Sequence, residues 1–339
     1  LLTNHTELFT LVKETLFKSR FDELPRIREL VAQSRSRKEQ SITGAGHSLA
    51  MMAASAKLAP TALLSHQSRG LASIQAIKLL DDSLDDAEAL ATLGAKLNVM
   101  HQKLVQASRK FLLVGEPEQK DTLISSLMNT WQDVECSTGA AFTLKSTREH
   151  VKQAWVTSTQ VNFCAKAYTT VSVDHEDAAA LCVLGDFLRN GYLHRAIREQ
   201  GGAYGSGAGQ DSGDALFRFF SYRDPRMSQT LDDFDASVKW LLENSHDQSK
   251  LSEAILGVVS SIDKPASPAG EAKQAYHSEL FGRSANQRKA FRAKILQVTI
   301  GDLQQAAQRY VPSENASIAV ITNADTAATL DSSYEVITL

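Results

Sequence analysis

The stretch Arg198-Glu-Gln-Gly-Gly-Ala-Tyr-Gly-Ser-Gly-Ala-Gly209 decides the fold that we predict for this chain. A stripe of leucine and tyrosine at helical spacing, residues 181–192, precedes it, and a pair of glycines is a typical helix end. Beyond the glycines, residues 203–209 predict a strand, the turn residues 210–213 reverse the chain, and residues 215–222 predict a second strand. The sequence therefore predicts a helix that ends at a glycine corner and continues into a β-hairpin.

Gly205, Gly207 and Gly209 recur at every second position of the first predicted strand, so they share one of its faces. A face without side chains leaves bare backbone against which a large group can pack. A neighbouring helix and a substrate chain both fit such a face, and from the spacing alone we favour the helix. A phosphate-binding loop does not fit, because no Lys-Ser/Thr pair completes it and the segment follows a helix instead of opening one.

Two interpretations of Arg198 remain open at this point. An arginine in the last turn stabilises the C-terminus of a helix and needs no further role. However, Arg198 lies six residues before Tyr204 across the glycine corner, so the helix end and the strand start can direct both side chains at one point. A guanidinium and a phenol are two hydrogen-bond donors that suit a developing oxyanion.

The composition limits the classes of protein to which the chain can belong. Its 339 residues predict two domains, since a domain typically holds roughly 100–200 residues. With 36 Lys and Arg against 39 Asp and Glu, the formal charge is −3, which argues against a nucleic-acid partner. Three cysteines are too few for a disulfide framework and predict a reducing compartment, either the cytoplasm or an organelle matrix. No apolar run reaches the roughly 18 residues of a membrane span, so we expect no membrane partner.

The chain divides into a helical part and an α+β part. Residues 1–132 predict helices, except for the apolar run 110–115, which predicts a buried strand. A single strand needs neighbours for its backbone groups, and these either belong to the sheet of the second domain or lie upstream of Leu1. Since the chain starts with Leu1 instead of Met, we favour neighbours upstream. Residues 133–155 lose the apolar periodicity and predict a linker, and residues 156–339 mix strands with helices. The later elements are predicted as helices over 248–262, 267–280, 285–296 and 300–310 and a strand over 317–322.

The sequence contains no complete catalytic or metal motif. The closest of the nine histidines are 19 residues apart, which excludes both the HExxH and the HxxEH zinc motifs. Cys136, Cys164 and Cys182 form no CxxC pair, and we expect them to be inert thiols. No G-x-S-x-G nucleophile elbow is present, and Asp211-Ser-Gly213 is interpreted as the turn of the hairpin. We therefore expect no zinc or other cofactor in this chain by itself.

Three segments of the sequence carry a resemblance to a known family. The first is Arg198-x-x-Gly-Gly-Ala-Tyr204-Gly with its hairpin, and the second is Phe219-x-Ser-Tyr-Arg-Asp-Pro225 before a predicted helix. Both are similar to the last domain of the pitrilysin/insulysin-type zinc metallopeptidases, most of all of their presequence-protease branch. The third, Gly44-Ala-Gly-His-Ser48, matches the third domain of that branch more loosely. The resemblance runs over nearly the whole chain.

This resemblance implies a fold and a place in a larger enzyme. The implied fold is α+β, with two domains of the pitrilysin/mitochondrial-processing-peptidase type in which an antiparallel-rich sheet packs on helices. Residues 1–132 resemble the mainly helical C-terminal part of a truncated third domain, and residues 156–339 resemble the fourth, catalytically inactive domain. The zinc motif of the family, HxxEH, belongs to the first half of the enzyme. The resemblance therefore implies that zinc is bound in that missing N-terminal half and not in this chain.

The resemblance also implies roles for single residues. Arg198 and Tyr204 match the arginine and the tyrosine that reach across a closed chamber to hydrogen-bond the substrate near its scissile carbonyl. Gly205, Ser206 and Gly207, at the start of the glycine-rich strand, would line the chamber wall. The match at His47 implies a structural role only.

Two functions agree with these matches. In the first, the chain is the non-zinc C-terminal half of a metalloendopeptidase that encloses and degrades unfolded peptides, and it is inactive alone. Its partners are then the zinc-bearing N-terminal half and the peptides. In the second, the chain is a non-catalytic binding or scaffold subunit with the same fold. The presence of both Arg198 and Tyr204 favours the first function.

Overall fold

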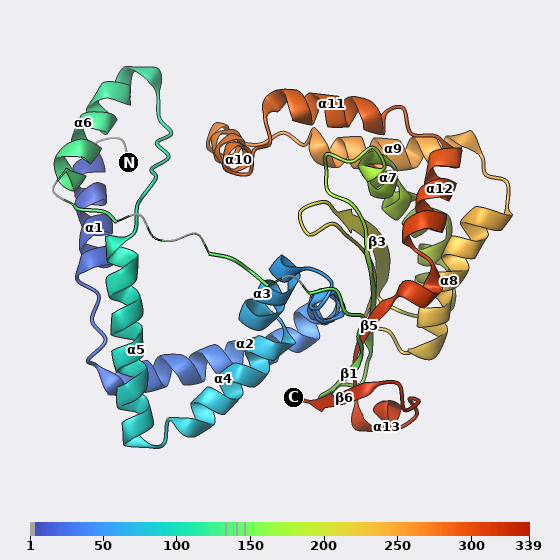
Figure 1. Cartoon of the computed structure of the whole chain (residues 1–339), viewed down its shortest axis with the longest axis horizontal. Coiled ribbons are helices and arrows are strands. Elements are labelled where there is room, and N and C mark those ends of the chain that lie inside the picture. The colour runs from blue at the N-terminus through green and yellow to red at the C-terminus, as the bar shows by residue number, and fades with distance from the viewer. Residues whose placement is uncertain (1–3, 133, 138, 140–141, 146) are drawn as a thin grey trace. The chain divides into compact units, whose positions relative to one another are not determined.

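The computed structural model describes all residues except 1–3, 133, 138, 140–141 and 146 (Figure 1). The chain forms two compact units, each made of segments that are far apart in the sequence. The helical unit consists of Leu1–Arg35, Lys78–Thr143 and Pro265–Ser284, and the sheet unit of Ser36–Ile77, Leu144–Lys264 and Ala285–Leu339. In the described part of the chain, no helix has both the length and the apolar character that a membrane crossing requires.

The helical unit is built from α1 (His5–Phe17), the first part of α2 (Leu24–Ser55), the end of α4 (Leu71–Ser83), α5 (Ala87–Gln106), η1 (Pro117–Gln119), α6 (Lys120–Trp131) and α10 (Pro268–Leu280). Asp86 begins α5 by accepting the N–H of Glu88, which satisfies one of the free donors of the first turn. Asp81 at the end of α4 pairs with both Arg28 and Arg35 of α2. These ion pairs hold the two helices together.

The strand predicted for residues 110–115 is wrong. Residues Lys110–Gly115 are irregular, and the side chains of Phe111 and Val114 are 44% and 46% exposed. The run pairs with none of the described strands, and an unpaired extended segment gains nothing from strand geometry. Phe111 instead contacts Trp131 of α6, with 5.1 Å between the ring centroids.

The sheet unit contains one mixed sheet with the strand order β3-β4-β2-β5-β1-β6. The strands are β1 (Lys152–Val156), β2 (Phe163–Thr169), β3 (Gly205–Asp211), β4 (Leu216–Tyr222), β5 (Ser317–Thr322) and β6 (Glu335–Thr338). β1 runs parallel to β5 and β6, and the other neighbours are antiparallel. β3 is therefore an edge strand that pairs with β4 alone.

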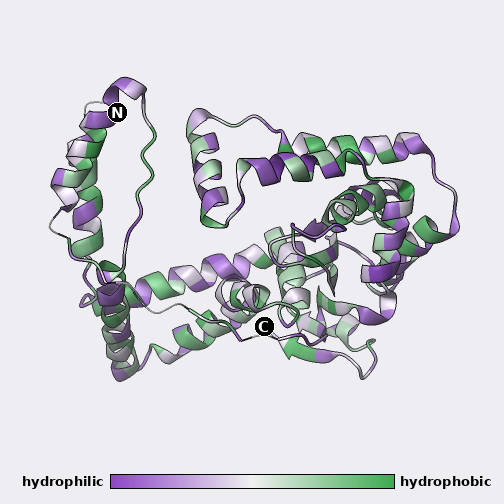
Figure 2. Cartoon of the chain, turned by 45° about the horizontal axis from the view of Figure 1, so that its top comes forward, coloured by the Kyte–Doolittle hydropathy of each residue, from purple (hydrophilic) through white to green (hydrophobic). Residues whose placement is uncertain are grey.

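Helices cover both faces of this sheet. One face packs against α7 (Ala178–Leu188) and α8 (Ser228–Glu243), through a core that includes Leu184, Phe234 and Val320. The helices α9 (Gln248–Ile262) and α12 (Ile300–Tyr310) pack on α7 and extend this core. The other face packs against the second part of α2, α3 (Pro60–Arg69) and the start of α4, through Leu49 and Phe163. The remaining elements are η2 (Arg189–Gln200), α11 (Ala285–Ile295), η3 (Ser313–Asn315) and α13 (Ala324–Ala327). Most helices carry apolar residues on one face and polar residues on another, as Figure 2 shows.

The mixed sheet with its helices is the predicted α+β fold. The predicted linker, residues 133–155, ends inside β1, so its last residues from Lys152 onward belong to the sheet. The assignment of residues 1–132 and 156–339 to a third and a fourth peptidase domain stays a prediction, because the compact units combine segments from both ranges.

Candidate functional site

The glycine corner lies where the π-helix η2 ends and the edge strand β3 begins. Gly202 has a φ of +79°, a conformation that favours glycine, and its N–H donates to the carbonyl of Arg198 at 3.1 Å. The next N–H, of Ala203, donates to Ile197 O at 3.1 Å. At Gly201 a side-chain carbon would lie 2.5 Å from the backbone carbonyl oxygen of Ile197, and it would also collide with the guanidinium of Arg226. Both glycines are therefore required for this corner, each for a different reason.

Tyr204 follows the corner and is held mainly by its backbone. Its N–H donates to Tyr222 O at 3.0 Å, which joins the start of β3 to the end of β4. The ring of Tyr204 lies edge-on to the ring of Tyr222, with 5.6 Å between the centroids. The residue is nevertheless 68% exposed. Its phenol is thus presented to solvent from a fixed backbone.

The two predicted site residues lie on either side of the Gly201–Gly202 pair in the sheet unit. Arg198 occupies the last turn of η2 and is exposed, and Tyr204 stands at the other side of the Gly201–Gly202 pair. Within the described residues, neither side chain makes a hydrogen bond or an ion pair, with the other or with a third group. Two donors at one exposed corner are thus available for a ligand.

The predicted chamber-wall residues Gly205, Ser206 and Gly207 all lie in β3, and they have different surroundings. A side-chain carbon at Gly205 or Gly209 would meet nothing within 4 Å, whereas one at Gly207 would lie 2.8 Å from the ring of Phe220. Ser206 Oγ donates to Leu193 O at 3.2 Å and ties β3 to η2. The glycine face is therefore open at both ends and covered by one ring in its middle.

A helix does pack closely on β3, but it lies on the face opposite the glycines, whereas the spacing favoured a helix on the glycine face. A side-chain carbon at Gly185 of α7 would lie 2.7 Å from both Ala208 O and Gly209 Cα. Since the missing side chain of Gly209 points into open space, α7 must lie on its other side. The preference for a helix on the glycine face was wrong. The glycine that permits close helix packing is in the helix.

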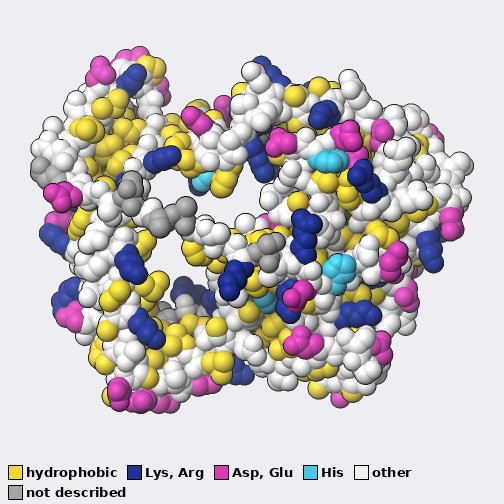
Figure 3. Space-filling view, in the orientation of Figure 1, with side chains coloured by type: hydrophobic (Ala, Val, Ile, Leu, Met, Phe, Trp, Pro, Cys, Tyr) yellow, Lys and Arg dark blue, Asp and Glu magenta, His cyan; other side chains and the backbone are white. Residues whose placement is uncertain are grey.

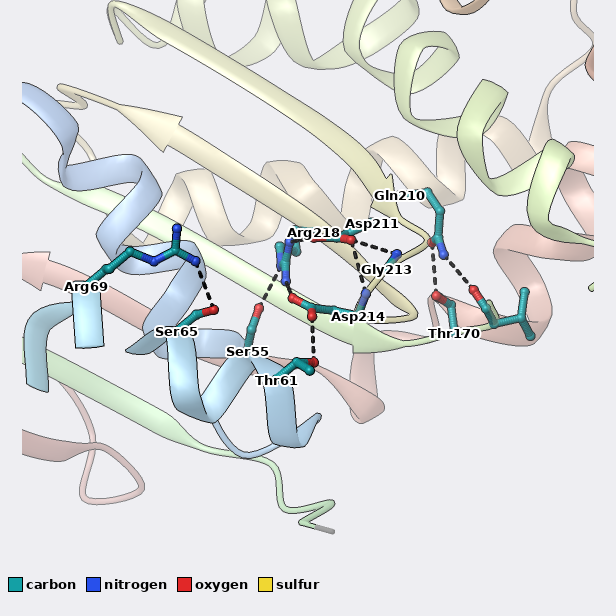
Figure 4. A network of polar contacts seen from close by, with 11 residues as sticks. Ser55, Thr61, Ser65, Arg69, Thr170, Gln210, Asp211, Gly213, Asp214 and Arg218 are labelled. Carbon is teal, nitrogen blue, oxygen red and sulfur yellow. Dashed lines mark hydrogen bonds and ion pairs between the residues drawn. The ribbon is translucent and has the colours of Figure 1, made fainter. Parts of the chain in front are cut away.

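The far end of the hairpin is anchored by a polar network that Figure 4 shows. Arg218 of β4 donates to Asp211 at 2.7 Å, to Asp214 at 2.8 Å and to Ser55 Oγ at 2.8 Å. Asp214 also accepts from the Thr61 hydroxyl at 2.7 Å. Burial alone would raise the pKa of Asp211, but the hydrogen bond and charge of Arg218 lower it below the ordinary value. The network fixes the β3–β4 turn to α2 and α3.

Asp224 stabilises the near end of the hairpin. It is fully buried, and burial raises the pKa of its carboxyl group, although it accepts from Thr230 Oγ1 at 2.7 Å and from the N–H of Arg226 at 3.0 Å. Its backbone N–H and C=O pair with Asn162, at 2.9 Å and 2.7 Å. The backbone just before it turns sharply, since Arg223 has a φ of +50°. Both ends of the hairpin are thus fixed, and β3 is held between them.

Sequence reasoning missed one residue of this site, Tyr222. The motif Phe219-x-Ser-Tyr-Arg-Asp-Pro225 contains it, and the hairpin was predicted, but the contact with Tyr204 depends on the strand register. No metal centre accompanies the site: among the residues that the structure describes, no three His, Cys, Asp or Glu side chains are grouped so that they could hold an ion.

Two family models match this chain. Residues 1–80 match the model of a region associated with M16 peptidases, and residues 152–324, more than half of the chain, match "PreP C-terminal domain". The chain belongs to the PreP C-terminal domain family. This confirms the predicted relationship to the C-terminal half of presequence-protease-type M16 peptidases.

Curated relatives of this family match nearly the whole chain. "Presequence protease, mitochondrial" of Drosophila melanogaster is 32% identical over 321 residues, which cover 92% of this chain and 30% of the relative. The protein of the same name from Danio rerio is 30% identical over 332 residues, which cover 91% of this chain and 32% of the relative. The chain thus spans about a third of the length of these relatives.

Solved structures support the fold of this PreP C-terminal domain chain. Pitrilysin superposes with a TM-score of 0.69 at 12% identity, covering 98% of this chain and 36% of pitrilysin. A peptidase M16 inactive domain from Pseudomonas fluorescens superposes with a TM-score of 0.57 at 17% identity, covering 89% of this chain and 70% of that domain. Both matches confirm the predicted pitrilysin-like α+β fold.

Proposed function

We propose that this chain is the non-zinc, C-terminal half of a zinc metalloendopeptidase that encloses and degrades unfolded peptides. The names of the relatives support a peptidase, and the chain spans only about a third of their length. Its partner would be an N-terminal half that holds the zinc. In the described part of this chain the available donor groups do not fit a zinc ion. In this proposal the chain by itself is inactive, and the N-terminal half supplies the metal.

Exposed apolar side chains on the helical unit support a partner surface. Leu8 and Leu11 of α1 are 51% and 61% exposed, and Met128 of α6 is 59% exposed. Figure 3 shows apolar side chains gathered over α1 and α6. Soluble domains seldom leave large apolar patches uncovered, so such patches favour a surface that another part of a protein covers.

The observation that carries the proposal is the pair of free donors at the glycine corner. Arg198 and Tyr204 are exposed, and no hydrogen bond among the described residues uses either side chain. When a peptide carbonyl is attacked, negative charge develops on its oxygen, and donors that are already in place stabilise that charge. Arg198 supplies a permanent cation and Tyr204 an uncharged donor. The open glycine face that follows Tyr204 would form part of the chamber wall.

The test is to reconstitute the enzyme from its two halves. This chain is mixed with the HxxEH-bearing half of the same protein and zinc, and cleavage of an unfolded fluorogenic peptide is compared with that by either piece alone. We expect cleavage to require both halves. Binding of the two halves without cleavage would favour the scaffold function instead, and chelator-sensitive activity of this chain alone would contradict the proposal.

The names of the relatives also support a proposal for the compartment. Proteins that match this chain are named mitochondrial, or chloroplastic and mitochondrial in Arabidopsis thaliana. All three cysteines of this chain are free thiols in the structure. We therefore propose an organelle matrix, which is a reducing compartment, as the place where the chain acts.

A further inference from the structure

The exposed side chain of Tyr204 has one ring contact that can orient it. The ring of Tyr222 lies 5.6 Å from it, with an interplanar angle of 82°, and among the described residues no other aromatic ring contacts Tyr204. The carbonyl of Tyr222 also accepts the N–H of Tyr204 at 3.0 Å. Holding an exposed side chain in one rotamer costs conformational entropy, so the orientation of Tyr204 depends on a contact that offsets this cost.

Tyr222 itself is held from several sides. The ring of His47 lies 4.9 Å from it, the ring of Phe163 lies 5.8 Å away, and the guanidinium carbon of Arg223 stands 5.3 Å from its centroid. These contacts come from three elements, namely α2, β2 and the turn after β4. Tyr222 is therefore a fixed ring, whereas Tyr204 is a solvent-exposed one.

His47 reaches Tyr222 because the helix that carries it changes direction and approaches the sheet. Ala45 has non-helical angles (φ −128°, ψ 20°) inside α2, and a side-chain carbon at Gly46 would lie 2.6 Å from the ring of Phe163. Only a glycine permits this approach. His47 also contacts the ring of Phe220, with 5.3 Å between the ring centroids, so it packs against two rings of β4, those of Phe220 and Tyr222.

We infer that Tyr222, held in place by His47, is the positioning residue that orients the phenol of Tyr204. This inference rests on the proposed function, in which Tyr204 donates a hydrogen bond to the reacting peptide. Tyr222 does not touch the peptide itself. Its effect is to raise the fraction of time that Tyr204 spends in the productive rotamer. An edge-to-face aromatic pair changes such an equilibrium by roughly 2- to 12-fold.

The first experiment measures the orientation of Tyr204 directly, without the zinc half. The chain contains seven tyrosines, and they are replaced by 3-fluorotyrosine for ¹⁹F NMR. The signal of Tyr204 is the one that disappears in Tyr204→Phe. We expect this signal to shift and broaden in Tyr222→Leu and to stay in place in Tyr222→Phe, which keeps the ring. The control is Tyr334→Leu, the same change directly before β6, the opposite edge strand of the sheet, and it must leave the signal unchanged.

A second variant keeps this test decisive if Tyr222→Leu does not fold. His47→Leu removes the ring that holds Tyr222 from the helix side, and it should shift the signal of Tyr204 in the same direction by a smaller amount. If the signal of Tyr204 is the same in the wild type and in the folded variants, Tyr222 does not position it, and the inference is wrong.

The second experiment uses the reconstituted enzyme and separates positioning from mere stability. We expect Tyr222→Leu to lower kcat roughly 2- to 12-fold in the wild type. In the Tyr204→Phe background it should lower kcat no further, because the donor that it orients is absent. An equal loss in both backgrounds would contradict the inference.

The two proposals can fail separately. If Tyr204→Phe leaves kcat unchanged, the catalytic role of Tyr204 is refuted, and the ¹⁹F experiment alone then decides whether Tyr222 positions it. If Tyr204→Phe lowers kcat and the ¹⁹F signal does not respond to Tyr222, the catalytic role stands and the positioning role is refuted.

Discussion

Nη1 of Arg218 lies 2.7 Å from Oδ2 of Asp211, across the ends of the two strands of the hairpin. Arg218 is only 19% exposed and also donates to Asp214 and Ser55. The hairpin that carries the candidate site is thus fastened to α2 by this guanidinium and to α3 by the hydrogen bond between Thr61 and Asp214.

We predict that Arg218→Met lowers the free energy of unfolding by roughly 1–3 kcal/mol, because it leaves two partly buried carboxylates without their cation. Urea denaturation measures the change. The control is Lys18→Met, which removes the exposed ion pair with Glu14 (71% and 48% exposed) and should cost less than about 1 kcal/mol. Similar costs for the two variants would contradict the role assigned to Arg218.

The close packing of α7 on β3 makes a second prediction. Gly185→Ala places a carbon about 2.7 Å from backbone atoms of Ala208 and Gly209, which cannot move aside as a flexible side chain can. We expect a loss of roughly 1–3 kcal/mol in unfolding free energy. Gly209→Ala, whose new carbon meets nothing within 4 Å, should be neutral or slightly stabilising. A tolerated Gly185→Ala would show that α7 can shift away from the strand.

A buried histidine predicts acid sensitivity. Burial lowers the pKa of His66 from 6.5 to about 4, and its Nδ1 has no hydrogen-bond partner. The unfolded chain therefore takes up a proton at a higher pH than the folded chain does, so stability is complete above about pH 6.5 and is lost as the pH falls towards 4. We expect roughly 1–2 kcal/mol to be lost between pH 7.5 and pH 5.

The variant His66→Phe tests this assignment. It keeps a ring against Trp155, whose centroid lies 5.6 Å from that of His66, and it removes the titrating group. Urea denaturation at pH 7.5 and pH 5 should then show a smaller difference for His66→Phe than for the wild type. An unchanged difference would assign the acid sensitivity to another group.

The catalytic role of Tyr204 predicts a change in rate without a change in stability. In the reconstituted enzyme, Tyr204→Phe should lower kcat roughly 10- to 1000-fold, by analogy with the loss of one oxyanion donor. The side chain is 68% exposed and makes no hydrogen bond among the described residues, so the free energy of unfolding should stay within about 0.5 kcal/mol. Full activity with normal folding would exclude the role.

The thiols of the chain should differ strongly in reactivity. Burial raises the pKa of Cys164 to about 12 and that of Cys182 to about 11. Cys136 is exposed, so its sulfur is open to a reagent, and the guanidinium of Arg109 donates to it at 3.1 Å. Iodoacetamide at pH 8, followed by mass spectrometry, should modify Cys136 first in the native chain. Equal labelling of Cys164 would contradict its burial.

The later helices and the last core strand were predictable from the sequence because their signals are local. The prediction of a helix over 248–262 and of a strand over 317–322 agrees with α9 and β5 residue by residue. The side chain of Asp247 accepts the N–H of Ser249 and begins α9, and all residues of β5 are buried, as its apolar run indicates. Local signals in the sequence therefore mark both elements.

β1 and β6 were missed because nothing local marks them. Each is short, and β1 pairs in parallel with β5 and β6, which lie about half a chain away in the sequence. β6, Glu335–Thr338, is mostly exposed and has no apolar alternation. A strand of this kind is defined by its partners, which single-sequence periodicity does not reveal.

The candidate site was predictable only where it depends on local sequence. The corner at Gly201 and Gly202 follows from residue types, because a positive φ favours glycine, and the structure has φ +79° at Gly202. The contact between Tyr204 and Tyr222 requires the strand register, and the contact with His47 requires the approach of a helix more than 150 residues earlier in the chain. Such contacts arise from tertiary packing, and a pattern in the sequence alone does not predict them.

The π-helix that carries Arg198 has a consequence for which mutations the chain can accept in evolution. A π-turn spans one residue more than an α-turn, so η2 contains extra length over Arg189–Gln200. Deleting a single residue there would let the segment relax into ordinary α-helical turns and would rotate Arg198 away from the glycine corner. The direction of this guanidinium is therefore set by the number of residues before it as much as by their identity, and insertions and deletions affect it more severely than substitutions do.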